Sequence, residues 1–140
     1  MIMAAVDGTR EAEVAVKGEC DVARARIAAK RLATDLGMRR DAIYRLATAV
    51  TELASNLVFH TTDGGVIRLT TIVETDRQGV EVAAEDHGPG LADIGLAMTD
   101  GYSSNGGLGG GLPGCKRLMD EFEISSRPGK GTLVVARLWR

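Results

Sequence analysis

The spacing of apolar residues along the chain predicts two consecutive helices. Residues 21–36 place small and aliphatic side chains three or four positions apart, as an amphipathic helix does, and Gly37 follows as a natural C-cap. A second apolar stripe with the same period runs from Asp41, a natural N-cap, to about Phe59. We therefore expect two helices, over residues 21–36 and 41–59, that each bury one face.

Other segments have the composition of strands. Residues 66–75 and 80–86 are rich in β-branched side chains and flank a short polar turn, which predicts a hairpin. The remaining elements that we expect are a short strand over 11–17, a short helix around 93–98, a helix from Pro113 to about Asp120, and strands over 121–126 and 132–139. This order of helices and strands indicates an α+β fold, an α/β sandwich with a mostly antiparallel sheet.

Composition limits the class of protein. A chain of 140 residues is expected to form a single domain over residues 1–140. Its 17 basic and 19 acidic residues leave a net charge of −2, so we expect no nucleic-acid binding. The apolar opening, residues 1–6, is too short for a membrane span or a secretion signal. We expect a cytoplasmic protein that binds no membrane, with Cys20 and Cys115 as free thiols.

Two polar residues border the apolar stripe of the second expected helix. Glu52 and Asn56 are four positions apart, which places them about 40° from each other around a helix. A carboxylate and a carboxamide on one face can hold a divalent cation, and a partly desolvated glutamate is a stronger base. For this pair considered alone, an ordinary solvated helix border is the more common explanation.

A carboxylate ends the strand expected over residues 80–86. Alternation places Asp86 on the same face as the apolar residues of that strand, where a carboxylate is costly unless it meets hydrogen-bond donors. Gly88 and Gly90 follow and allow a flat ligand to approach the backbone closely. The amino group of adenine is one donor that would satisfy Asp86. The alternative is an aspartate that caps a turn.

A glycine-rich segment precedes the helix expected from Pro113. Its glycines expose backbone N–H groups, and the helix start adds a positive dipole end, which together favour a phosphate cradle over a merely mobile loop. Further along, Thr132 alternates in phase with the apolar residues of the last strand and faces the core side. One inward threonine is usually structural, but beside Asp86 it could share an adenine site.

Four segments of the chain carry a family resemblance. Residues 52–56, 86–90, 106–112 and 129–132 resemble, in order and spacing, the four motifs of the GHKL (Bergerat-fold) ATPases. The resemblance covers roughly residues 41–140. Within that superfamily, the run from Gly106 to Phe122 is similar to the partner-switching serine/threonine kinases of bacterial stress signalling, including the stressosome pathway.

This resemblance implies an ATP- and Mg²⁺-dependent protein serine/threonine kinase. By the resemblance, Glu52 would polarise the attacking hydroxyl of a protein substrate, and Asn56 would coordinate Mg²⁺. The expected substrate is a STAS-domain antagonist protein, and the released kinase would activate a PP2C-type phosphatase. The alternative is a nucleotide-regulated module that binds a sigma factor or a phosphatase and has little kinase activity.

The resemblance also implies a set of nucleotide contacts. Asp86 would accept a hydrogen bond from the adenine amino group, Gly88 and Gly90 would shape that pocket, and Thr132 would support the base. The phosphate contacts are expected from a glycine-rich lid, comprising Gly107, Leu108, Gly109, Gly110, Gly111 and Leu112.

A cluster of arginines lies at the start of the second expected helix. Arg39, Arg40 and Arg45 could meet an acidic partner, although a solvated charged face is the more common explanation. The sequence predicts neither the oligomeric state nor a role for residues 1–40.

Overall fold

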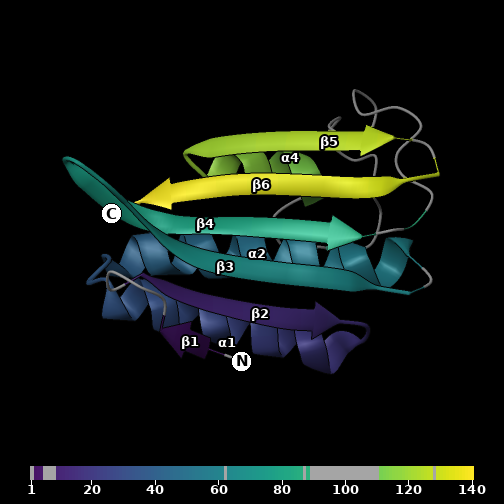
Figure 1. Ribbon diagram of the computed structural model, residues 1–140, viewed down its shortest axis with the longest axis horizontal. Helices are drawn as coiled ribbons and strands as arrows, with labels where there is room; N and C mark the ends of the chain where they lie inside the picture. Colours follow the sequence, from purple (N-terminus) through teal and green to yellow (C-terminus); the bar gives the residue numbers. More distant parts are fainter. Residues whose placement is uncertain (1, 5–8, 62, 87, 89–110, 128) are drawn as a thin grey trace.

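A computed structural model of the chain describes residues 2–4, 9–61, 63–86, 88, 111–127 and 129–140. Helices cover one face of a six-stranded antiparallel sheet whose strand order is β1-β2-β3-β4-β6-β5 (Figure 1). The elements in chain order are β1 (Ile2–Ala4), β2 (Arg10–Val16), α1 (Glu19–Asp35), α2 (Arg40–His60), β3 (Gly65–Glu74), β4 (Arg77–Asp86), α4 (Gly111–Leu118), β5 (Glu121–Arg127) and β6 (Gly131–Trp139). The predicted α+β sandwich is therefore confirmed.

Most of the predicted elements lie within two or three residues of their expected positions, and β1 was not predicted. Strand β1 has only three residues, Ile2–Ala4, which pair with β2. A segment this short has no periodic pattern to indicate a strand. The short helix expected around residues 93–98 lies outside the residues that the structure describes.

The helix ends correct two of the predictions. Gly37 follows the C-cap Leu36 of α1 with a φ of 74°, as expected of a glycine at a helix end. Asp41, however, is not the N-cap of α2, because the helix begins at Arg40 and Arg39 occupies the cap position. An acidic residue is favourable both at the cap and in the first turn, so the sequence does not separate the two positions. Likewise, Pro113 is the third residue of α4 and not the first.

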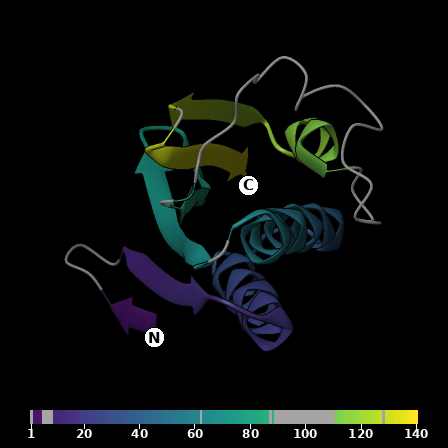
Figure 2. The ribbon, with the colours of Figure 1, turned by 90° about the vertical axis from the view of Figure 1, so that its right-hand side faces the viewer.

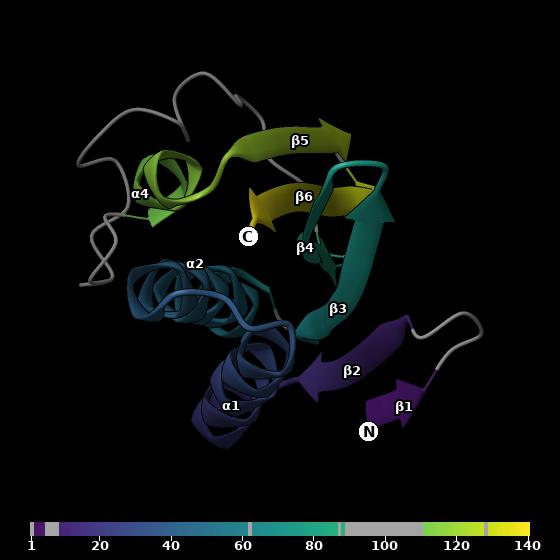
Figure 3. The same ribbon diagram turned by 90° about the vertical axis from the view of Figure 1, so that its left-hand side faces the viewer.

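The core lies between the sheet and the helices. Helix α2 lies between α1 and α4 on the covered face of the sheet (Figures 2 and 3). Leucine, isoleucine and valine side chains from α1, α2 and the inner face of β2, β3, β4 and β6 are fully buried there, and the largest of them are Leu32, Leu46, Leu53, Ile67, Leu69 and Leu138. Among the described residues, no helix combines the length and apolar character needed to cross a bilayer.

Candidate functional site

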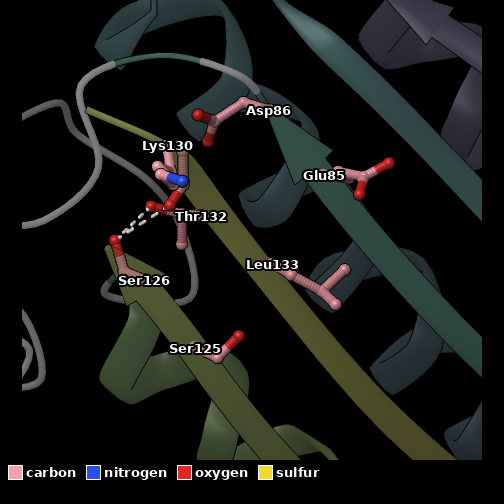
Figure 4. A pocket seen from close by; sticks show the side chains of 8 residues that line it. Glu85, Asp86, Ser125, Ser126, Lys130, Thr132 and Leu133 are labelled. Carbon is pink, nitrogen blue, oxygen red and sulfur yellow. Dashed lines mark hydrogen bonds between the residues drawn. The ribbon is translucent and has the colours of Figure 1, made fainter. Parts of the chain in front are cut away.

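A pocket of about 320 Å³ opens where β4 and β5 end and β6 begins (Figure 4). Its described lining residues are Glu85, Asp86, Ser125, Ser126, Lys130, Gly131, Thr132 and Leu133. The structure thus brings together Asp86 and Thr132, two of the residues that the sequence predicts for a base pocket. Lys130, which is exposed, is the one cation among these lining residues.

Three polar side chains extend the apolar rows of the inner sheet face into this pocket. Asp86, Thr132 and Ser126 each lie two positions from an apolar residue that packs in or against the core, respectively Ala84, Val134 and Ile124. The alternation that predicted an inward Asp86 and Thr132 is confirmed, because Ala84 and Val134 are buried. Adjacent strands therefore present a carboxylate and two hydroxyl groups side by side.

Asp86 is oriented by the loop that follows it. Its Oδ1 atom accepts a hydrogen bond of 2.8 Å from the backbone N–H of Gly88. The turn-capping alternative and the pocket position therefore both hold for this one side chain. A Cβ atom added to Gly88 would lie 3.2 Å from Oδ1 of Asp86 and 3.4 Å from Cγ2 of Thr61, so glycine lets the loop lie close to both residues. Gly90 lies outside the described residues.

Sequence reasoning missed Ser126. Its Oγ atom lies 2.9 Å from Oγ1 of Thr132 and donates to the carbonyl oxygen of Gly131 at 3.2 Å. A serine near the end of a strand carries no signal by itself. The short turn between the last two strands could have identified it, because a tight hairpin there pairs Ser126 of the first strand with Thr132 of the second.

Glu52 and Asn56 lie on α2 and are not among the described lining residues of the pocket. Glu52 is only 3% exposed, so the solvated helix border is the wrong explanation for this carboxylate. Asn56 is half-buried, as expected of a residue at the edge of the core.

The buried carboxylate of Glu52 faces the same region as α4. The Cys115 thiol of α4 is fully buried, and its Sγ atom lies 3.9 Å from the carbonyl oxygen of Ala49, one turn before Glu52. Burial, and secondarily the negative charge of Glu52, raise the pKa of Cys115 to about 12. Both Cys20 and Cys115 are free thiols, as predicted.

Helix α4 is held at its C-terminal end by Arg45 of α2. The Nε–H group of Arg45 donates to the carbonyl oxygen of Leu118 at 2.9 Å, and the guanidinium lies 3.7 Å from the carboxylate of Asp120. A cation at this end also complements the helix dipole. Arg45 therefore anchors α4. The sequence suggested that Arg45 belongs to one solvated charged face with Arg39 and Arg40, and the structure corrects this.

The glycine-rich lid is described only where it joins α4. Gly111 is buried, with a φ of 73°, and Leu112 packs against the core. The other predicted phosphate contacts, Gly107, Leu108, Gly109 and Gly110, lie outside the described residues. Within the described part of the chain, no three His, Cys, Asp or Glu side chains are grouped so that they could hold a metal ion.

Comparisons with known proteins agree with this arrangement. The sequence model of a family described as the histidine kinase-like ATPase domain matches residues 16–138. The chain is 40% identical over 126 residues to the serine/threonine-protein kinase RsbT of Bacillus subtilis, covering 90% of this chain and 94% of the relative. It is 31% identical over 115 residues to an anti-sigma F factor of a Thermoanaerobacter species, covering 79% of each chain.

A solved structure supports the fold. The crystal structure of the RsbU and RsbW domains of a Mycobacterium tuberculosis protein superimposes with a TM-score of 0.61 at 17% identity. The match covers 93% of this chain and 32% of that longer chain. From the extent of the family match, the chain belongs to the histidine kinase-like ATPase domain family, the GHKL class that its four sequence segments resemble.

Proposed function

We propose that the protein is an ATP-dependent serine/threonine kinase that phosphorylates a protein partner. The similarity to a protein named as a serine/threonine kinase, at 40% identity over 90% of the chain, is the observation that carries this proposal. The pocket at the end of the sheet and the buried Glu52 on α2 support it independently.

The pocket chemistry suits the adenine of ATP. Asp86 supplies a hydrogen-bond acceptor on the inner face of the sheet, and the exocyclic amino group of adenine is a matching donor. The side chain of Thr132 lies on the same face, and Lys130 places a positive charge at the rim. A base bound here would lie at the ends of three strands, and the backbone N–H groups at the N-terminus of α4 would favour its anionic phosphates.

Two residues of α2 would serve the transfer step. Asn56 offers a carboxamide oxygen, the type of ligand that suits Mg²⁺, and the bound ion would neutralise phosphate charge. Glu52 would accept the proton of the substrate hydroxyl. The hydroxyl oxygen would bond to the γ-phosphorus of ATP, and the bond between the γ-phosphorus and the bridging β-phosphate oxygen would break, releasing ADP. The Glu52 side chain is only 3% exposed, so it is shielded from bulk water where it would act.

The substrate that we propose is a small STAS-domain antagonist, with a PP2C-type phosphatase as a second partner once the kinase is released. The similarity to anti-sigma F factors, 31% identity over 79% of the chain, favours one other function. In that case the protein is a nucleotide-regulated module that binds a sigma factor, and transfer of phosphate is negligible.

The test is transfer of labelled γ-phosphate from Mg-ATP to a STAS-domain protein encoded near this gene. Wild type is compared with Glu52→Gln, which keeps the size of the side chain, and with Glu123→Gln, a matched control on the exposed surface of β5. ATP affinity is measured for each protein by calorimetry.

Kinase function predicts label on serine or threonine with wild type and the control. It also predicts a loss of about 100-fold or more with Glu52→Gln at unchanged ATP affinity. Transfer that is unaffected by Glu52→Gln removes Glu52 from the mechanism. ATP binding without transfer to any tested STAS protein favours the sigma-factor module.

A further inference from the structure

We propose that Thr61, the residue that directly follows α2, holds this helix in line with the base pocket and is a positioning residue for phosphate transfer. Its hydroxyl group and its methyl group each lead to Asp86, by two different routes. The inference rests on the proposed function, in which Asp86 binds the base of ATP and two residues of α2, Glu52 and Asn56, act at the phosphates.

The proposed reaction needs two separate elements to keep a fixed relative position. Asp86 ends β4, whereas Glu52 and Asn56 lie on α2. A nucleotide that contacts both elements is placed for transfer only when the elements stay aligned, and a displacement of about 1 Å lowers a rate by up to about 100-fold. A contact that joins the end of α2 to the end of β4 therefore affects the rate of transfer.

Helix α2 ends at the end of the sheet where β3 begins and β4 ends (Figure 1). Thr61 is the C-cap of α2 and is half-buried. Across the β3–β4 pair, Gly65 is the register partner of Asp86. A Cβ atom added to Gly65 would lie 2.3 Å from the carbonyl oxygen of Glu85 and 2.8 Å from Cδ2 of Leu57. The start of β3 therefore lies in close contact with both α2 and β4.

The hydroxyl group of Thr61 joins the last turn of α2 to the turn before β3. Its Oγ1 atom lies 2.6 Å from the carbonyl oxygen of Leu57 and 3.0 Å from that of Gly64. Carbonyl oxygens only accept, so the hydroxyl is the donor toward both and shares its one hydrogen in a three-centre hydrogen bond. Gly64 leads directly into Gly65, the register partner of Asp86, so this route ends at the base pocket.

The methyl group of Thr61 leads to the pocket by a second route. A Cβ atom added to Gly88 would lie 3.4 Å from Cγ2 of Thr61 and 3.2 Å from Oδ1 of Asp86, so the backbone of Gly88 lies close to both side chains. The N–H group of Gly88 donates to this same Oδ1 at 2.8 Å. The methyl group thus restrains the glycine that orients the carboxylate of the pocket.

Helix α2 supplies a matched control in Thr51. Its Oγ1 atom donates to the carbonyl oxygen of Ala47 at 2.8 Å, four residues earlier, which is the relation that Thr61 has to Leu57. Thr51 is also half-buried, but this hydrogen bond begins and ends within α2. Thr51→Val therefore removes a comparable hydrogen bond without touching the junction with β3 and β4, and threonine and valine have similar helix propensities.

The experiment measures the ATP dissociation constant by calorimetry and the rate of transfer to the STAS-domain protein at saturating ATP. Wild type is compared with Thr61→Val, which loses the hydroxyl and keeps a methyl group, and with Thr61→Ser, which keeps the hydroxyl and loses the methyl group. Thr51→Val is the control.

The two substitutions of Thr61 are expected to separate rate from affinity. Thr61→Val should lower the rate at saturating ATP about tenfold and leave the ATP affinity within about twofold, because the base is still held while α2 is displaced from the phosphates. Thr61→Ser should keep the rate and weaken ATP binding about three- to fivefold, because Gly88 orients Asp86 less firmly. Thr51→Val should match wild type in both measurements.

This separation distinguishes positioning from a merely structural role. Thr61→Val and Thr51→Val each lose one hydrogen bond from a hydroxyl to a carbonyl, so a structural role predicts similar melting temperatures and similar rates for the two variants. A folded Thr61→Val protein with the wild-type rate would overturn the proposal, and so would an equal fall of the rate in Thr51→Val or in Thr61→Ser.

The affinity measurement keeps the proposal testable if Thr61→Val does not fold. In that case Thr61→Ser decides, and wild-type ATP affinity of this variant would overturn the proposal. A wild-type protein that binds ATP but transfers no phosphate refutes the kinase function alone, and the ATP affinity of Thr61→Ser again decides the role of Thr61. A wild-type protein that does not bind ATP refutes both.

Discussion

Removal of the Arg45 side chain is predicted to loosen α4 from α2. Arg45 makes the hydrogen bond to the carbonyl oxygen of Leu118, at 2.9 Å, and the ion pair with Asp120, at 3.7 Å. Both contacts hold the end of α4, or the segment that directly follows it, against α2. Since α4 begins at Gly111, where the glycine-rich lid joins it, a looser α4 should affect nucleotide binding as well as stability.

The magnitude follows from the exposure of the groups. A hydrogen bond to a charged donor contributes about 1.5–3 kcal/mol, and the lower end applies because the Arg45 side chain is 37% exposed. The ion pair adds at most about 0.5 kcal/mol, since the Asp120 side chain is 41% exposed. We therefore expect Arg45→Ala to lower the free energy of unfolding by about 2 kcal/mol, and the melting temperature by roughly 6 °C.

The chain offers a matched control six positions earlier. Arg39 pairs with Asp41 at 3.4 Å, but the two side chains are 88% and 69% exposed, so Arg39→Ala should change the free energy of unfolding by less than about 0.5 kcal/mol. Urea unfolding followed by circular dichroism gives both values, and ATP titration gives the effect on binding. Equal stability and equal ATP affinity of the two variants would refute the anchoring role of Arg45.

Three further predictions concern other parts of the molecule. At pH 8 iodoacetamide should modify the exposed Cys20 within minutes and leave Cys115 unmodified until the protein unfolds, because burial raises the pKa of the Cys115 thiol to about 12. Rapid modification of both thiols, detected by mass spectrometry, would contradict the burial of Cys115. Gly65→Ala should lower the free energy of unfolding by about 2 kcal/mol, since the new Cβ would lie within 2.3 Å of the carbonyl oxygen of Glu85. A free energy of unfolding equal to that of wild type, measured by urea titration, would refute this close approach. Hydrogen bonds from the indole N–H of Trp139 and the guanidinium of Arg137 lower the pKa of Glu121, so its contribution to stability is complete above the ordinary pKa of 4.5 and is lost as the pH falls through the lowered value. Glu121→Gln should reduce the loss of stability at acid pH, measured by urea titrations at several pH values. An unchanged dependence of the free energy of unfolding on pH would contradict this role.

The helices and strands were largely predictable because their patterns are long. Helix α2 extends over 21 residues and carries one apolar stripe, and the strands β3 and β4 each extend over 10. Patterns of this length identify an element whatever its partners. The exceptions are short or terminal features: β1 has three residues, and the start of α2 depends on one position, Arg40, that propensity does not distinguish from its neighbour Asp41.

The candidate site was predictable in part, for a physical reason. Strand alternation alone places Asp86 and Thr132 on the inner face, and the register of β4 with β6 brings them together. The contact of Ser126 with Thr132 crosses a strand pair, and the burial of Cys115 beside the Glu52 region depends on the packing of α4 on α2. Such relations join residues far apart in the sequence, so no local pattern reports them.

The central claim is that the pocket at the ends of β4, β5 and β6 binds ATP through Asp86. Calorimetric titration of ATP into wild type and Asp86→Asn tests it most directly, because asparagine keeps an oxygen that can accept the hydrogen bond from Gly88 but replaces the other carboxylate oxygen with an NH2 donor. We expect wild type to bind ATP and Asp86→Asn, at unchanged melting temperature, to bind it about 10- to 100-fold more weakly. Equal ATP affinity of the two proteins, or no binding by wild type, would contradict it.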